Sequence, residues 1–174
     1  MDSLHDVGAV VIGRNEGERL RTCLMSLRRQ LDFVVYVDSG SADESVSMAQ
    51  TLGVDVVALD MKLPFTAARA RNAGFQRLWE LHPELRLVQF VDGDCEVMGS
   101  WLVNAVDFLN ARSDIAVVCG RRRERFPDLS VYNLLCDLEW NTALGETRAC
   151  GGDALIRLKP LAEVCGYRES LIAS

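Results

Sequence analysis

Short apolar runs alternate with segments of helical periodicity along the first 119 residues. We predict that the runs are buried strands, because each is short and rich in apolar, β-branched or aromatic side chains. They cover residues 7–12, 33–37, 55–59, 85–91 and 115–119. The segments between them favour helices over about 15–31, 41–53, 66–81 and 100–110. Strict alternation of this kind predicts an α/β fold with a mostly parallel sheet and helices on both faces.

Polar residues at the start of these helical segments predict N-terminal caps. Asn15 precedes Glu18 by three positions, and Ser41 precedes Glu44 by three, which is the spacing of a capping box. Ser100 is predicted to cap the fourth helical segment.

The pattern changes after Gly120. A basic run at residues 121–125 is followed by an amphipathic helix over about 129–144, a strand at 154–158 and a short helix after Pro160. We interpret the basic run as a solvated strand end, with binding of a diphosphate or an anionic membrane surface as the alternatives. Trp79, Trp101 and Trp140 are expected to pack in the core or between helices, with Trp140 as the one that could instead form an aromatic wall of an acceptor site.

Composition places the chain among ordinary globular proteins. It has 174 residues, 49% hydrophobic and 25% charged, which favours one soluble domain with its own core. The net charge of −6 argues against general nucleic-acid binding, and no apolar run has the length of a membrane span. Six cysteines without a Cys-x-x-Cys pair, together with two histidines, exclude zinc spacing and favour the cytoplasm. No secretion signal is visible.

Asp92-Gly93-Asp94 directly follows the apolar run at 85–91. Ligands of open α/β sheets bind at the carboxyl ends of strands, and the intervening glycine allows both carboxylates to turn toward one point. Two hard oxygen ligands suit Mg²⁺ or Mn²⁺ together with substrate phosphates. An ordinary Asp-Gly turn is the alternative reading.

Three further polar sites lie at or near the same predicted edge. Asn15 and Glu16 follow the first strand, Asp38 follows the second, and Arg71 lies on the third helix. Asp38 could accept from a base or a ribose hydroxyl, and Arg71 could pair with phosphate or ribose. Taken singly, each also has a structural reading as a helix cap, an Asx-turn or a solvated charge.

These motifs, in this order, resemble those of the family 2 glycosyltransferases with the GT-A fold. The stretches that carry the resemblance are 10–16, 37–43, 70–74, 92–94 and 151–157, so the match spans nearly the whole chain. The resemblance implies that Asp38 contacts the nucleobase and that Arg71 and Asn72 lie near the nucleotide. It also implies that Asp92 and Asp94 form a DxD motif that binds the ribose and a divalent metal.

The loop Gly151-Gly152-Asp153 then borders the acceptor. The resemblance further divides the single domain, 1–174, into a nucleotide-sugar-binding part at 1–119 and the start of an acceptor-side part at 120–174. It implies an inverting transfer from a nucleotide-diphospho-sugar to a saccharide or lipid-linked acceptor, in polysaccharide biosynthesis, with peripheral membrane contact as an option.

The family's catalytic base, an acidic residue soon after the segment matching 166–168, has no counterpart before Ser174. Glu169 and Asp153 are the nearest carboxylates, and we expect neither to be the base and the chain to be truncated. Two alternatives remain open: a non-catalytic nucleotide-sugar-binding module, and a sugar nucleotidyltransferase. The nucleotidyltransferase reading is weakened because residues 13–16 lack a glycine-rich basic phosphate loop.

Overall fold

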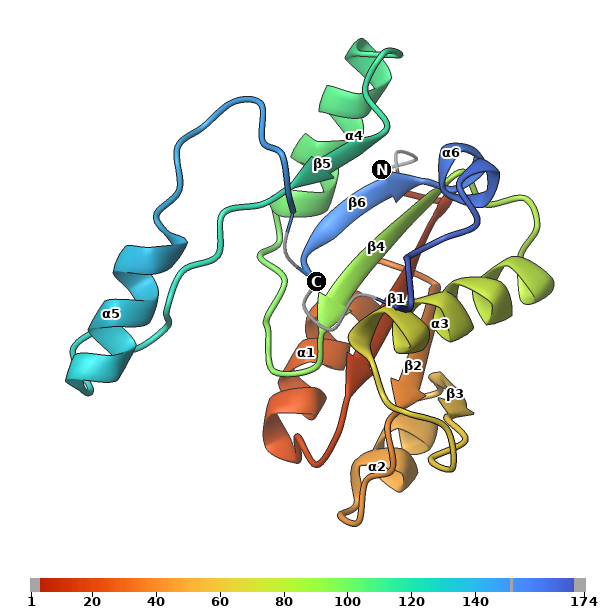
Figure 1. Cartoon of the computed structure of the whole chain (residues 1–174), viewed down its shortest axis with the longest axis vertical. Coiled ribbons are helices and arrows are strands. Elements are labelled where there is room, and N and C mark those ends of the chain that lie inside the picture. The colour runs from red at the N-terminus through yellow and green to blue at the C-terminus, as the bar shows by residue number, and fades with distance from the viewer. Residues whose placement is uncertain (1–3, 151, 171–174) are drawn as a thin grey trace.

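A computed structural model describes residues 4–150 and 152–170 and contains a six-stranded sheet with helices on both faces (Figure 1). The strands are β1 (Val7–Gly13), β2 (Phe33–Asp38), β3 (Asp55–Ala58), β4 (Leu87–Asp92), β5 (Val117–Cys119) and β6 (Ala154–Arg157). The helices are α1 (Glu18–Arg28), α2 (Ser45–Thr51), α3 (Ala67–Leu81), α4 (Trp101–Ala111), α5 (Val131–Trp140) and α6 (Leu158–Glu163). Each strand predicted from the sequence is confirmed within two residues at either end.

The order of strands across the sheet is β3-β2-β1-β4-β6-β5. β1 pairs in parallel with β2 and β4, and β2 pairs in parallel with β3. β6 is antiparallel to both β4 and β5, so the late part of the chain completes the sheet begun by the first part. The predicted α/β fold with a mostly parallel sheet is therefore confirmed.

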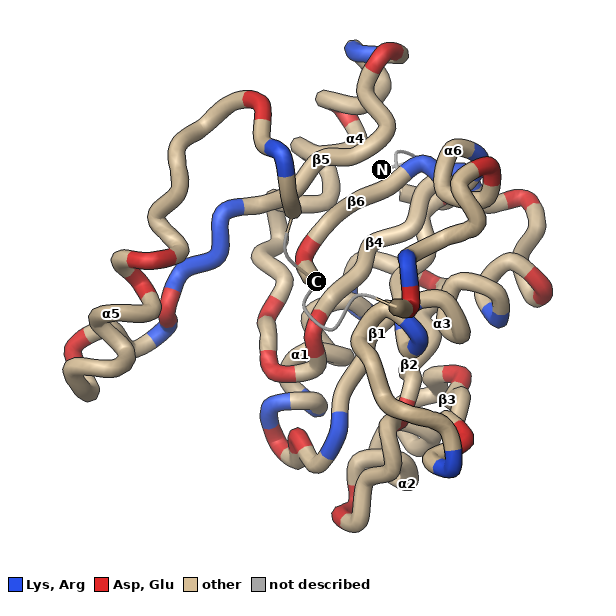
Figure 2. The backbone as a smooth tube through the Cα atoms, in the orientation of Figure 1, with Lys and Arg blue, Asp and Glu red and all other residues tan. Residues whose placement is uncertain are grey.

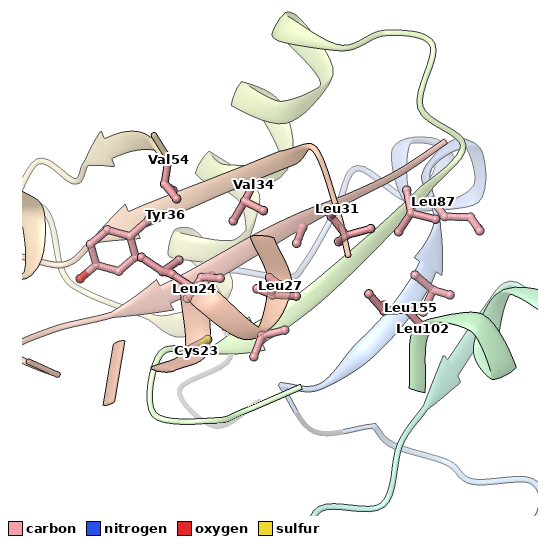
Figure 3. Close-up of a cluster of buried hydrophobic side chains, with 14 of the residues drawn as sticks. Cys23, Leu24, Leu27, Leu31, Val34, Tyr36, Val54, Leu87, Leu102 and Leu155 are labelled. Atoms are coloured by element: carbon pink, nitrogen blue, oxygen red, sulfur yellow. The ribbon is translucent and has the colours of Figure 1, made fainter. Parts of the chain in front are cut away.

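The sheet separates two apolar cores, and β1 contributes to both by alternation. Val7, Ala9 and Val11 face α1, α2 and α4, whereas Val10 and Ile12 face α3 and α6. Figure 3 shows the first of these cores, where leucines of α1 pack against the strands. A sheet covered on both faces explains why its strands are continuous apolar runs.

Two predicted helix caps are wrong. α1 begins at Glu18 with Gly17 at the cap position, and α2 begins at Ser45 rather than after Ser41. The Asn15 side chain accepts the backbone N–H of Ala42 at 2.7 Å, and the Ser41 hydroxyl accepts the N–H of Asn15 at 2.9 Å. These residues join two loops at the sheet edge instead of capping their own helices. Ser100 holds the cap position of α4, but its side chain makes no cap hydrogen bond.

Residues 120–144, which we call the arm, leave the body after β5 and carry α5 (Figure 1). α5 is shorter than the 129–144 predicted, and none of its 10 described residues is buried. After the arm the chain returns to the body before β6 (Figure 1). Among the described residues, no helix combines the length and apolarity that crossing a bilayer requires.

Candidate functional site

The strand register brings the predicted polar sites to one edge of the sheet. Gly13 at the end of β1 lies beside Asp38 at the end of β2, and Ile12 lies beside Asp92 at the end of β4. Ala154, the first residue of the antiparallel β6, pairs with Phe90. The loop before β6 therefore reaches the edge where the parallel strands end, which is where open α/β sheets bind ligands.

Asp92 is held from α3. The guanidinium of Arg71 donates from Nη2 to Asp92 Oδ1 at 3.0 Å. Arg71 is only 4% exposed, whereas the Asp92 side chain keeps 31% of its surface accessible. The carboxylate is thus fixed on one side by a buried cation and remains open on another, so Arg71 is placed to orient Asp92.

Gly152 closes against this pair. A Cβ atom at this position would lie 2.4 Å from Asp92 Oδ2 and 2.7 Å from Arg71 Nη2, well inside van der Waals contact. Only glycine fits such a close approach without moving the ion pair. Gly151, predicted with it as part of the acceptor loop, lies outside the described residues.

Asp153 adds a third carboxylate. Burial, together with the charges of Asp92 and Asp94, raises its pKa to about 6 against the opposing effect of Arg122. The Nε of Arg122 lies 3.4 Å from Asp153 Oδ2, and within the described residues neither oxygen of this carboxylate receives a well-aligned hydrogen bond. Asp92, Asp94 and Asp153 thus form a site with excess negative charge.

Asp94 is exposed, and its Oδ1 lies 3.5 Å from the thiol of Cys95, which donates to it. Burial, together with the charges of Asp153, Asp94 and Asp92, raises the pKa of the Cys95 thiol. That thiol therefore stays protonated and neutral at physiological pH, so it adds no negative charge of its own.

Glu16 lies on the other side of the same edge. Its carboxylate is paired with Arg19 at 2.8 Å, and a Cβ on Gly93 would lie 3.4 Å from its Cγ. Burial raises the pKa of Glu16, Arg19 lowers it, and the charge of Asp94 raises it again. The structure therefore brings Glu16 within the electrostatic reach of Asp94.

Asp38 is 4% exposed and shapes a turn. Its Oδ2 accepts the backbone N–H groups of Gly40 and Ser41 at 3.0 and 2.9 Å, and its Oδ1 accepts the Tyr36 hydroxyl at 3.0 Å. The arrangement is the Asx-turn that was the structural alternative for this residue.

Asn72 binds the segment after α6. Its Oδ1 accepts the N–H of Tyr167 at 2.7 Å, and its Nδ2 donates to the Tyr167 carbonyl and to Glu169 Oε1, each at 2.9 Å. Glu169, one of the two carboxylates nearest the expected base position, is thereby tied to α3.

A cleft of about 1090 Å³ opens between the body and the arm. Asp92, Asp94 and Asp153 line it, whereas Asn15, Glu16, Asp38, Arg71 and Asn72 are not among its described lining residues. Trp101 forms part of its floor and donates from Nε1 to the buried Gln89 Oε1 at 2.8 Å.

The basic run at 121–125 enters the cleft from the arm, where Figure 2 shows it as a blue stretch between β5 and α5. The run is solvated, as predicted, but three of its four arginines also have acidic partners: Arg122 lies near Asp153, Arg123 binds Asp137 at 2.7 Å and Arg125 binds Glu96 at 2.6 Å, and the side chains of Arg123 and Arg125 are 63% and 62% exposed. Arg121 donates to the carbonyl oxygen of Thr142 at 2.7 Å. The guanidinium of Arg122 also lies 5.2 Å from the ring centroid of Trp140. Trp140 is therefore a cleft residue and not part of the core.

The sequence signalled the carboxylates but not the groups that hold them. Arg122 on Asp153, Gly152 against Asp92 and Tyr167 beside Arg71 were not singled out for these contacts, because each joins positions 20 or more residues apart that no local pattern relates.

Among residues 4–150 and 152–170, no three His, Cys, Asp or Glu side chains converge to hold a metal ion by themselves. The oxygen-only, negatively charged set at Asp92 and Asp94 nevertheless fits a hard cation that takes its remaining ligands from water or phosphate.

Solved structures with a similar fold are glycosyltransferases of the GT-A type. A mannosyltransferase from Pyrobaculum calidifontis, in complex with GDP-Man and Mn²⁺, aligns with a TM-score of 0.67 and 21% identity, covering 95% of this chain and 48% of that one. Residues 1–349 of TarS from S. aureus align with a TM-score of 0.63 and 17% identity, covering 96% and 52%. Glucosyl-3-phosphoglycerate synthase from Mycobacterium tuberculosis, with Mn²⁺, UDP-glucose and glycerol 3-phosphate, aligns with a TM-score of 0.58 and 21% identity, covering 90% of this chain and 58% of that one.

At this level of identity the likeness shows a shared fold, and the chain spans about half the length of the structures it matches. The family follows from the sequence profile of the glycosyl transferase family 2, which matches residues 9–156. The chain belongs to this family.

Proposed function

We propose that this chain binds a nucleotide-diphospho-sugar at the edge formed by β1, β2, β4 and the start of β6, as the donor side of a metal-dependent glycosyl transfer. The observation that carries the proposal is the set of three carboxylates, Asp92, Asp94 and Asp153, on the wall of one cleft. Burial, and then the charges of its acidic neighbours, raise the pKa of Asp153 to about 6. These three carboxylates would repel a diphosphate unless a cation lay between them and it.

We assign the cation to Asp92 and Asp94, with Mn²⁺ or Mg²⁺ as the ion. The Mn²⁺ in the mannosyltransferase and synthase structures supports a divalent metal. When bound, the ion would supply Lewis-acid stabilisation of the charge on the departing nucleoside diphosphate. Asp92 contributes a carboxylate whose orientation Arg71 fixes, and Asp94 contributes an exposed one.

The nucleotide is proposed to lie over the loops after β1 and β2. Asn15 joins these loops through its hydrogen bonds to Ser41 and Ala42. Asp38 stabilises the loop after β2 by accepting a backbone N–H of that loop. Asp38 is occupied by its own turn, so we propose that it presents the backbone of that turn to the base. Glu16 flanks the diphosphate end near Asp94.

The acceptor is proposed to enter from the side of Gly152 and Asp153, where the arm forms the opposite wall of the cleft. An inverting displacement needs a carboxylate base for the acceptor hydroxyl. Glu169 is bound to Asn72 and Asp153 is paired with Arg122, so we propose neither as that base. For the compartment we propose the cytoplasm, since the six cysteines are free thiols.

Calorimetric titration with UDP and GDP, each with and without Mn²⁺, tests the donor site. We expect one of the two nucleotides to bind, with an affinity that falls at least tenfold when Mn²⁺ is removed or when Asp94 is replaced by Ala. Asp107→Ala, which removes an exposed carboxylate on α4, is the matched control and should bind as the wild type does. Equal binding with and without metal would refute the cation assignment. Because neither Glu169 nor Asp153 is proposed as the base, tight metal-dependent binding without sugar transfer would not distinguish this proposal from a non-catalytic module.

A further inference from the structure

Both the oxygen and the nitrogen of the Asn72 side-chain amide form hydrogen bonds with one segment that is distant in the sequence. It accepts the N–H of Tyr167 and donates to the carbonyl of the same residue and to Glu169, across 95 to 97 positions of the chain. Asn72 itself is 9% exposed. A buried side chain that satisfies both backbone groups of one residue in an irregular segment determines the path of that segment.

The segment it binds follows a tight turn. Cys165 and Gly166 have positive φ angles of 60° and 77°, and the N–H of Gly166 donates to the carbonyl oxygen of Leu161 in α6. A Cβ on Gly166 would lie 2.5 Å from Asn72 Oδ1. The turn and the amide group are therefore in direct contact, and the turn delivers Tyr167 to a fixed place.

The ring of Tyr167 lies between β4 and Arg71. It meets the ring of Phe90 edge-on, with centroids 5.1 Å apart and an interplanar angle of 81°. The guanidinium carbon of Arg71 lies 5.6 Å from the centroid of the Tyr167 ring. The same guanidinium donates to Asp92, so contacts run without a break from Asn72 through Tyr167 and Arg71 to the Asp92 carboxylate.

We propose that Asn72 is a positioning residue for Asp92, acting through the ring of Tyr167 and the guanidinium of Arg71. The Tyr167 ring packs near the Arg71 guanidinium, and the same guanidinium donates a hydrogen bond to the Asp92 carboxylate. If the ring were displaced, the Arg71 side chain could tilt and would no longer hold Asp92 in place. The contacts stand on the structure alone, and only their consequence for metal binding rests on the proposed function.

A double-mutant cycle in the free energy of unfolding tests the contact path without reference to activity. Asn72→Ala is combined with Asp92→Asn and, as a control, with Asp55→Asn, which removes the carboxylate that Arg77 binds on the same helix. We expect Asn72→Ala to be non-additive with Asp92→Asn and additive with Asp55→Asn, because only Asp92 shares the path. Additivity in both pairs would show that Asn72 anchors the turn and nothing more, and would overturn the proposal.

A Mn²⁺ titration followed by electron paramagnetic resonance, in the presence of UDP or GDP, tests the consequence. We expect Asn72→Ala to weaken Mn²⁺ binding roughly tenfold, as loss of an outer partner of a metal ligand does, and Gln76→Ala on the same helix to leave it unchanged. Unchanged Mn²⁺ affinity in Asn72→Ala would contradict the proposal. If the wild type did not bind Mn²⁺, the proposed donor site would be refuted instead. The double-mutant cycle would then be the test of whether Asn72 positions Asp92.

A second variant guards against loss of folding. Asn72→Asp keeps an acceptor for the Tyr167 N–H but sets a carboxylate against Glu169, and adding Glu169→Gln restores a donor between the two side chains. We expect the double variant to recover part of the Mn²⁺ affinity lost by Asn72→Asp. No recovery in a folded double variant would count against the proposal.

Discussion

Asp92 is constrained by three neighbours at the sheet edge. It accepts from the buried Arg71 on α3, its backbone carbonyl accepts the N–H of Cys95 at 2.9 Å, and Gly152 lies against its side chain. Asp94, by contrast, is exposed and bound only lightly by the Cys95 thiol. The two aspartates of one tripeptide thus differ in rigidity, which gives the proposed cation site one fixed and one adjustable ligand.

Replacing Gly152 by Ala tests the fit around Asp92. We expect a loss of about 1–3 kcal/mol in the free energy of unfolding, because the new methyl group must displace Asp92 or Arg71. Gly99→Ala is the control, since nothing lies within 4 Å of the Cβ it would add. Chemical denaturation of both variants gives the comparison, and equal stability would contradict the close approach at Gly152.

A second residue-scale expectation concerns pH. Arg77 donates to both oxygens of Asp55 at 2.7 and 2.9 Å, and this bond lowers the pKa of the Asp55 carboxyl. A carboxylate with a lowered pKa stabilises the fold above its unfolded pKa, near 4, and loses that contribution as pH falls through the folded value.

Arg77→Ala should therefore lower the free energy of unfolding only slightly at pH 7, because the pair is partly exposed, and the difference from wild type should vanish toward pH 2. Thermal unfolding at a series of pH values measures it. A difference that grows on acidification would contradict the assigned sign.

The residue types at the site could be predicted from the sequence, but their partners could not. Asp92 and Asp94 stand out because two acids follow an apolar run directly. Asn15 and Asp38 also lie where polar turns are expected, yet the sequence alone could not show that Asn15 bonds the β2 loop and not its own helix. A cap and a loop-to-loop bond use the same side chain, and tertiary contacts decide between them.

At the scale of elements, the strands and helices of the body follow from periodicity because each has a face to bury. Leu20, Leu24 and Leu27 recur on one side of α1 and are fully buried. α5 has the same kind of pattern, with Leu134, Leu135 and Leu138, but these are 46%, 55% and 61% exposed. The spacing of apolar residues predicted α5 as a helix, but it could not show whether another surface covers its apolar face.

Leucine-to-alanine changes in two helices test this difference. Leu102→Ala in α4, where the side chain is 0% exposed, should cost about 2–5 kcal/mol through lost burial and a cavity. Leu138→Ala in α5, at 61% exposure, should change the free energy of unfolding by less than about 0.5 kcal/mol. Denaturant titration of both variants is the measurement, and a cost at Leu138 equal to that at Leu102 would mean that α5 is packed in solution.

At the scale of the whole molecule, the sheet brings the two parts of the chain into one site. β6 comes from beyond residue 150 and inserts between β4 and β5, so that Gly152 and Asp153 reach the edge where Asp92 ends β4. The antiparallel placement of β6 could not be predicted from alternation, because strand order across a sheet depends on long-range pairing. The arm then forms the second wall of the cleft.

A crystal of this chain grown with Mn²⁺ and a nucleoside diphosphate tests most directly whether Asp92 and Asp94 hold a cation against the diphosphate. We expect an anomalous manganese peak within coordination distance of a carboxylate oxygen of each aspartate, with the diphosphate completing its ligands. A nucleotide bound at this edge without manganese, or manganese bound only at other carboxylates, would contradict the account.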